Sequence, residues 1–296
     1  MSSTTTRKFL VFGATRNQGS NAVKWLSRQS QSSASRIFAV TRDITSDKSS
    51  AVASLPGFEP IQGDATQAKQ IFERVAAKLS GGEKINGVFF ALYGFDAEEQ
   101  IASSKVLIDV AVQSQVDHVL FSSGDYLGLR DVDTGLSALE AKKTVEDYLL
   151  ASSIPQKNIV RTTIFLDTFV RVPGFINTIR MWSSEHRGTG VATADIGRAV
   201  AKIFTSSTQF STEPVVGLAG YEGKPIEWLD AWQEVTGEDL RKKEMTRGGP
   251  PLSEERARFL KLLIQEECDT RVEESKATFP WLMDWKTFLQ ENAPLA

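Results

Sequence analysis

Short strand-like runs alternate with amphipathic helical segments along the first half of the chain, and this order constrains the fold more than any other feature. The runs are rich in β-branched and aromatic residues, which favours strands. Repeated βα order is typical of a parallel sheet with helices on both faces. The predicted strands are residues 8–12, 36–41, 58–62, 87–92, 118–122 and 158–163. We therefore expect an α/β fold with a doubly wound parallel sheet.

The segments between these strands carry apolar residues at helical spacing. The helices predicted in this part are residues 21–29, 68–79, 100–115 and 138–151. After about residue 165 the alternation stops, and helical pieces are predicted at residues 194–204, 226–236 and 253–274. We expect a first domain at residues 1–163, and a smaller, mainly helical C-terminal subdomain for a substrate or partner at residues 164–296.

Composition excludes several classes of protein. The formal net charge of −3 provides no positive field for a nucleic-acid backbone, and no Cys/His metal spacing is present, so neither direct nucleic-acid binding nor a metal site is expected. No apolar run is long enough to span a bilayer, and residues 1–8 lack an apolar signal segment. We expect no membrane association and a cytoplasmic location, with the nucleus left open. The single cysteine, Cys268, is expected within a helix as a reduced packing thiol.

A glycine-containing turn, Gly13 to Gly19, follows the first predicted strand and precedes a helical pattern. A pyrophosphate needs close backbone approach, free N–H groups and the positive end of a helix dipole, and glycines at such a turn allow all three. The strand, glycine turn and helix in this order predict a dinucleotide site on a Rossmann-type domain. The alternative is a βα turn that binds no ligand.

The second predicted strand ends at Thr41, Arg42 and Asp43. A protein specific for NAD usually has an acidic residue here to accept hydrogen bonds from the ribose 2′-hydroxyl. A guanidinium suits a 2′-phosphate, and we expect Arg16, from the glycine turn, to be able to reach the same charge. NADP(H) is therefore the expected cofactor. A rotated strand end would present Asp43 instead, and Arg42 would then be a solvated loop residue.

With these residues placed, the chain resembles the NmrA-like family of atypical short-chain dehydrogenases and is also similar to the isoflavone reductase branch. The residues that carry the resemblance are 12–15 with 17–19, 41–43, 62–64, 142–146, 161–165 and 195–200. The resemblance implies a Rossmann core with a small C-terminal domain over a cleft. The chain departs from the family at Arg16, where glycine is common, at Thr162, where proline is common, and at Asp167, where asparagine is common.

The motifs and the resemblance together define an expected cofactor site. The resemblance implies that Asp64 lies near the adenine and that residues 91–93 lie near the cofactor. The expected cofactor-binding residues are Gly13, Thr15, Arg16, Asn17, Gln18, Gly19, Arg42, Asp64, Ala91, Leu92, Tyr93, Ser122, Lys142, Ile164 and Phe165.

Lys142 is the strongest candidate for a catalytic residue. On a helix it falls within an apolar stripe with Ala138, Ala141, Val145 and Leu149. A lysine on the inward face needs a polar partner or a cleft, so this position is a candidate site. In relatives this lysine bonds the nicotinamide ribose, and in isoflavone reductase-like enzymes it acts in proton transfer. The alternatives are a side chain that reaches the rim, or one that pairs with Glu146.

The tyrosine acid of ordinary short-chain dehydrogenases stands four residues before the lysine, where this chain has Ala138. Tyr126 is a weaker candidate proton donor. Ser122 and Ser123 end the fifth predicted strand, where ligands bind in open α/β sheets, although they are equally suited to terminate the strand. For His118 and His186 we expect surface or capping roles.

Two functions fit these residues. In the first, NADP(H) occupancy changes the conformation of the small domain of a redox sensor, and regulatory protein partners respond to that change. In the second, an NADPH-dependent reductase acts on a small carbonyl, imine or enone, and Lys142 assists proton transfer. The lysine fits both functions, and the sequence leaves the substrate, the partner and the oligomeric state open.

Overall fold

The computed structural model describes residues 6–29, 35–91, 96–206, 208–243 and 254–293. The chain forms two compact units. The first unit comprises Met1–Ser123, Ser137–Val160 and Ile196–Val216. The second unit comprises Gly124–Leu136, Arg161–Asp195 and Gly217–Ala296.

The first unit is built on a seven-stranded sheet of order β3-β2-β1-β4-β5-β6-β9, as found among the described residues. The strands are β1 (Arg7–Phe12), β2 (Ser35–Thr41), β3 (Phe58–Gln62), β4 (Gly87–Ala91), β5 (His118–Gly124), β6 (Gln156–Thr162) and β9 (Val215–Leu218). β1 pairs in parallel with β2 and β4, β2 with β3, and β4 with β5. The strand order reverses between β1 and β4, so the sheet is doubly wound and the expected Rossmann-type fold is confirmed.

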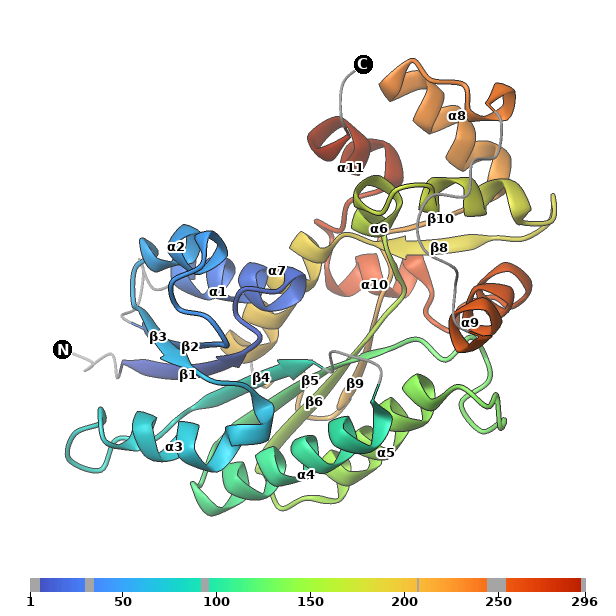
Figure 1. The fold of residues 1–296 in the computed structure, drawn as a ribbon. Coiled ribbons are helices and arrows are strands. Elements are labelled where there is room, and N and C mark those ends of the chain that lie inside the picture. Colours follow the sequence, from blue (N-terminus) through green and yellow to red (C-terminus); the bar gives the residue numbers. More distant parts are fainter. Residues whose placement is uncertain (1–5, 30–34, 92–95, 207, 244–253, 294–296) are drawn as a thin grey trace. The chain divides into compact units, whose positions relative to one another are not determined.

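Helices cover both faces of this sheet, with α3, α4 and α5 on one face and α1, α2 and α7 on the other (Figure 1). These helices are α1 (Asn17–Gln29), α2 (Asp47–Ala53), α3 (Ala68–Ala76), α4 (Ala97–Gln113), α5 (Ser137–Ala151) and α7 (Thr193–Thr205), and the short 3-10 turn η1 (Ala65–Gln67) precedes α3. Helices on both faces bury the strands, which explains their nearly continuous apolar sequences.

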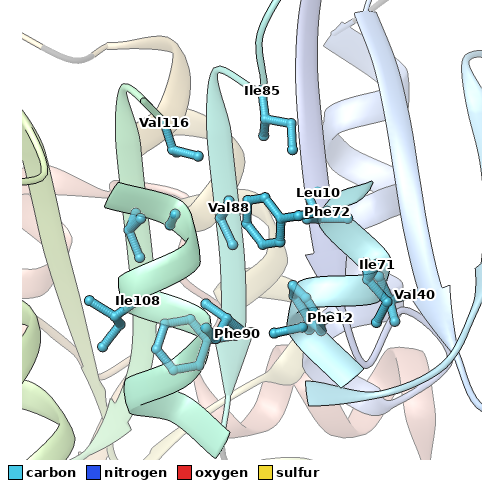
Figure 2. Close-up of a cluster of buried hydrophobic side chains, with 14 of the residues drawn as sticks. Leu10, Phe12, Val40, Ile71, Phe72, Ile85, Val88, Phe90, Ile108 and Val116 are labelled. Atoms are coloured by element: carbon cyan, nitrogen blue, oxygen red, sulfur yellow. The ribbon is translucent and has the colours of Figure 1, made fainter. Parts of the chain in front are cut away.

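An apolar cluster fills the space between the sheet and helices α3 and α4 (Figure 2). Leu10 and Val40 project from β1 and β2, and Ile71, Phe72 and Ile108 project from the helices. Their exposed fractions are 0 to 3%. Complete burial of such a side chain contributes about 1.5–3 kcal/mol. This layer therefore stabilises the strands, among them β1, which the glycine turn follows.

The second unit contains a small sheet of order β10-β8-β7 and several helices. Its elements are β7 (Ile164–Phe165), α6 (Leu166–Arg171), η2 (Phe175–Met181), β8 (Gly188–Val191), β10 (Tyr221–Gly223), α8 (Pro225–Thr236), η3 (Leu240–Lys242), α9 (Glu254–Gln265), α10 (Val272–Thr278) and α11 (Trp285–Asn292). Phe169, Trp228 and Trp285 form the centre of its core, with ring centroids 4.9 to 5.7 Å apart. The C-terminal region is helical, as expected.

The prediction of a single helix at residues 253–274 is wrong. The structure has two helices there, α9 and α10, with a break between them. The carboxylate of Asp125 accepts hydrogen bonds from the backbone N–H groups of Asp269 and Thr270, at 3.0 and 2.8 Å. These N–H groups are thereby withdrawn from helical pairing. Cys268 lies in this break and not in a helix, although it is buried as expected.

The chain passes between the two units more than once, whereas the sequence suggested one boundary at residue 163. α7 belongs mostly to the first unit, where Gly197 packs against α1 so closely that a Cβ would lie 2.3 Å from the backbone of Asn21. The strand β9 was also not predicted. Among the described residues, no helix combines the length and apolarity that crossing a membrane requires.

Candidate functional site

A cavity of about 380 Å³ opens in the first unit at the carboxyl ends of β1, β2, β3 and β4. This is the point where the strand order reverses, at which open α/β sheets bind ligands. The lining residues are Phe12, Gly13, Thr15, Arg16, Val40, Thr41, Arg42, Asp43, Ser46, Gly63, Asp64, Ala65, Thr66, Phe90, Ala91, Asp96, Glu99, Gln100, Ser103 and Ser104.

The glycine turn is held tightly against α1. Gly13 has φ of 68°, which is favourable only for glycine, and its carbonyl accepts the N–H of Arg16 at 2.8 Å. A Cβ on Gly19 would lie 2.2 Å from the Gly13 oxygen. Only glycine at this position lets the first turn of α1 approach the turn this closely. The free N–H groups of a helix terminus, placed next to such a turn, form a site suited to a phosphate.

A second contact joins the glycine turn to β2. The hydroxyls of Thr15 and Thr41 are hydrogen-bonded at 3.0 Å, and both residues line the cavity. Thr41 is buried at the end of β2, so the bond fixes the turn against the strand. Sequence analysis did not identify this role of Thr41.

Two arginines face the cavity, Arg16 from the glycine turn and Arg42 from the end of β2. Asp43 also lines it, but its Oδ1 accepts hydrogen bonds from the N–H and hydroxyl of Thr45, at 2.8 and 2.7 Å. These bonds lower the pKa of Asp43 and use the carboxylate to close the turn before α2. Arg16 and Arg42 thus bring two cationic residues to this end of the cavity, beside a carboxylate whose Oδ1 is engaged by Thr45.

Asp64 lies in the cavity wall after β3, where the resemblance places it near an adenine. Its Oδ1 caps the turn η1 by accepting the N–H and hydroxyl of Thr66, at 3.0 and 2.6 Å. Ala91, at the end of β4, also lines the cavity. Leu92 and Tyr93 lie outside the described residues.

Helix α4 contributes a polar wall that sequence analysis missed, formed by Glu99, Gln100, Ser103 and Ser104. Asp96 caps this helix by accepting the N–H of Glu99 at 2.9 Å and also lines the cavity. The spacing of three and four residues between these positions places them on one helical face, and this was a usable signal.

Asn17, Gln18 and Gly19 form the first turn of α1, and Ser122 lies near the end of β5. Ser122 donates a hydrogen bond from its hydroxyl to Oε1 of Gln18, and both side chains are buried. Ile164 and Phe165 form β7 in the second unit. None of these six residues is among the described residues that line the cavity.

Lys142 lies on α5 in the first unit and is partly buried. Desolvation lowers the pKa of its ammonium group to about 8, and the nearby carboxylate of Glu146 opposes this shift. Glu146, one turn further along α5, is completely buried. Ala138, predicted on the inward stripe, is exposed, and the neighbouring Leu139 is the residue of the first turn that is buried. Lys142 is not among the described residues that line the cavity, and Glu146, expected only as an alternative partner, acts on it through its charge.

Tyr126 is buried in the second unit, where the guanidiniums of Arg130 and Arg161 lie 5.7 and 5.0 Å from its ring centroid. Its surroundings indicate packing and cation–π contact, and its role as a proton donor stays a prediction.

The surface roles expected for the two histidines are wrong. Nε2 of His118 donates to Oδ1 of Asn158 at 2.8 Å inside the first unit, and desolvation lowers the pKa of His118 to about 4. His186 is buried against Trp182 in the second unit, and burial lowers its pKa as well. Both histidines are neutral packing residues at neutral pH. No cluster able to hold a metal ion occurs among the residues described.

The fold and the cavity define a class of protein, namely a Rossmann-type α/β protein with a ligand-sized cavity at the reversal of its strand order. Residues 5–248 match the NmrA-like family, and the chain belongs to this family. The comparison with curated protein sequences finds no significant match.

Several solved structures share this fold at low sequence identity. A structure of NmrA, a negative transcriptional regulator, aligns with a TM-score of 0.76 at 14% identity, over 97% of this chain and 95% of that one. NmrA in complex with NADP aligns with a TM-score of 0.74 at 16% identity, over 97% and 95%. The Citrobacter sp. triphenylmethane reductase complexed with NADP(H) aligns with a TM-score of 0.70 at 16% identity, over 97% and 99%. The TM-scores and the coverage establish a shared fold, and at these identities they establish the fold alone.

Proposed function

We propose that this protein binds NADP(H) and signals the redox state of the cofactor to a regulatory protein partner. The observation that carries the proposal is the cavity lined by both Arg16 and Arg42 next to the glycine turn. Structures of NmrA with NAD and with NADP, and of a reductase with NADP(H), are consistent with a dinucleotide in this fold.

The cavity residues fit the chemistry of a phosphorylated dinucleotide. A pyrophosphate requires backbone to approach without side chains, and Gly19 leaves the space that a Cβ would fill beside Gly13. A 2′-phosphate requires cationic donors, and Arg16 and Arg42 supply them while Asp43 is engaged by Thr45. Asp64 and the polar wall of α4 supply acceptors for the amino group of a base.

Calorimetric titration with NADPH, NADP⁺, NADH and NAD⁺ tests the cofactor. We expect the wild-type protein to prefer NADPH over NADH, and Arg42→Ala to reduce this preference on the order of 10-fold, since a charge-assisted hydrogen bond contributes about 1.5–3 kcal/mol. Arg28→Ala, at an exposed arginine in the last turn of α1 outside the cavity, is the matched control. Equal affinities for NADPH and NADH in the wild-type protein would exclude the NADP(H) preference.

The sensor function has its own requirement, because a ligand shifts a conformational equilibrium only through different affinities for the two states. The position four residues before Lys142 is Ala138, which cannot donate a proton, and this favours a binding role. We expect NADPH and NADP⁺ to bind with dissociation constants at least about 10-fold apart. Equal dissociation constants, together with identical hydrogen-exchange patterns of the two complexes, would exclude redox sensing.

A reductase is the second candidate, and the lowered pKa of Lys142 favours it. The bound nicotinamide would supply hydride, and a lysine with a pKa of about 8 is suited to hold or release a proton near neutral pH. NADPH consumption is measured against a panel of aldehydes, ketones, imines and enones. Turnover that Lys142→Ala abolishes, without loss of NADPH binding, would establish the enzyme in place of the sensor.

A further inference from the structure

The hydrogen bond between Gln18 and Ser122 joins two buried side chains that lie 104 residues apart in the chain. Their exposed fractions are 7% and 0%, respectively. The bond satisfies polar groups that would otherwise be costly to bury, and its two ends belong to different elements of the first unit. Gln18 is in the first turn of α1, and Ser122 is in β5.

The position of the bond relates it to the cavity. Ser122 pairs in register with Ala91 of β4, and Ala91 lines the cavity. The cavity extends from β4 towards β2 and β3, so Ser122 stands on the opposite side of β4. Under the proposed function, the adenosine half of the cofactor occupies the cavity. The nicotinamide half must then cross the first turn of α1 towards β5.

The first turn of α1 is supported on both sides. On the cavity side, Gly19 packs against Gly13, and Thr15 is bonded to Thr41. On the β5 side, the bond from Ser122 to Gln18 provides the support. Loss of this bond leaves the contacts on the cavity side in place, so its effect is confined to the part of a ligand that extends past α1.

We propose that Gln18 and Ser122 form a positioning pair for the nicotinamide half of the cofactor, an inference that rests on the proposed function. The pair fixes the distance between the first turn of α1 and the end of β5. Ser122 then acts through Gln18, so direct contact with the ligand is not required of its hydroxyl. This differs from the role in ligand contact that its place at a strand end suggested.

Half-cofactor probes test the pair. Affinities for NADPH and for 2′,5′-ADP, which carries only the adenosine half, are measured by calorimetry on Gln18→Met, Ser122→Ala and the double variant. We expect each single variant to weaken NADPH binding on the order of 10-fold and to leave 2′,5′-ADP within about 2-fold. The double variant should match the single variants, since both remove one bond. Lys24→Met, exposed on the same helix, is the matched control.

Each other outcome has a definite meaning. Equal weakening of both ligands would show a general structural role, and unchanged NADPH binding would show that the pair does not position the cofactor. Additive losses in the double variant would show that the two residues act separately. If Ser122→Ala does not fold, Gln18→Met alone decides through the ratio of the two affinities. A wild-type protein that binds neither ligand would refute the proposed function itself.

Discussion

At the scale of single residues, the absence of one carbon atom shapes the glycine turn. Gly19 allows the first turn of α1 to lie directly against the carbonyl of Gly13. At Lys142 a long charged side chain is held where its ammonium group is partly desolvated. This desolvation lowers the stability of the folded protein. Under the proposed function, both residues would serve ligand binding.

Gly19→Ala should disrupt the turn. The added Cβ would lie 2.2 Å from the Gly13 oxygen, so the backbone must move, which costs about 1–3 kcal/mol of unfolding free energy. Urea unfolding and NADPH titration measure the two losses, and we expect the affinity to fall at least about 10-fold. Ser20→Ala, the next residue of the helix, is the control. An unchanged affinity would show that the close approach is not needed for binding.

The pH dependence of stability should reveal Lys142. Its pKa is lowered from 10.5 to about 8 in the folded protein, so the unfolded state binds more protons between these values and stability rises with pH across this window. Lys142→Met removes the cost of burying the charge. We expect the variant to be more stable than the wild type at pH 7, by at most about 3 kcal/mol and less because the residue is partly exposed.

This advantage should shrink as the pH rises from 8 to 10.5, as measured by urea unfolding at several pH values. Lys143→Met, the neighbouring lysine on α5, controls for the loss of one positive charge. An advantage that is constant with pH would show that the ammonium group of Lys142 is well solvated.

At the scale of elements, the carboxylate of Asp125 organises the segment between α9 and α10. It accepts hydrogen bonds from the N–H groups of Leu127, Asp269 and Thr270 and from the Thr270 hydroxyl, at 2.7 to 3.0 Å. One side chain thus joins two parts of the second unit that are distant in sequence and determines where α10 can begin.

Asp125→Asn should loosen this segment. The amide nitrogen cannot accept a hydrogen bond, so donors that now reach Oδ1 or Oδ2 lose their partner, at a cost of about 2–3 kcal/mol of unfolding free energy. Hydrogen exchange should accelerate at the amides of Asp269 and Thr270. Asp131→Asn, at an exposed carboxylate, is the control. Protection equal to that of the wild type would show that other contacts hold the segment.

Sequence patterns located the strands well where a strand is long enough to show its pattern. All six predicted strands are present, with ends within two residues of the prediction. The strands that were not predicted, β7 to β10, have two to four residues each, which is too short to show a period. Their extended shape depends on the neighbour with which each strand pairs.

The candidate site likewise contains residues that the local sequence predicts and contacts that it does not. Residues of the glycine turn and the strand ends were predictable because their positions follow from the local chain. The bonds from Thr15 to Thr41 and from Gln18 to Ser122 join residues 26 and 104 positions apart, and no local pattern encodes such pairs.

At the scale of the whole molecule, cofactor binding should appear as stability of the first unit. A ligand that binds only the folded state at 100 times its dissociation constant adds about 2.7 kcal/mol. We expect NADPH to raise the unfolding free energy reported by slowly exchanging amides of β1 and α1 by this amount. If NADPH binds but the exchange of these amides does not slow, the binding site lies outside the first unit.

The return of the chain to the first unit at Ile196–Val216 has a practical consequence for anyone who divides the protein into fragments. Cutting after residue 163 removes α7, whose Val200, Ile203 and Phe204 are completely buried, and it removes the seventh strand. A fragment of this kind would expose a broad apolar face and would aggregate, although it retains the entire glycine turn. The first unit is thus one compact body built from three separate stretches of the chain, and a fragment that contains all of it must join these stretches, in their original order, through new connections.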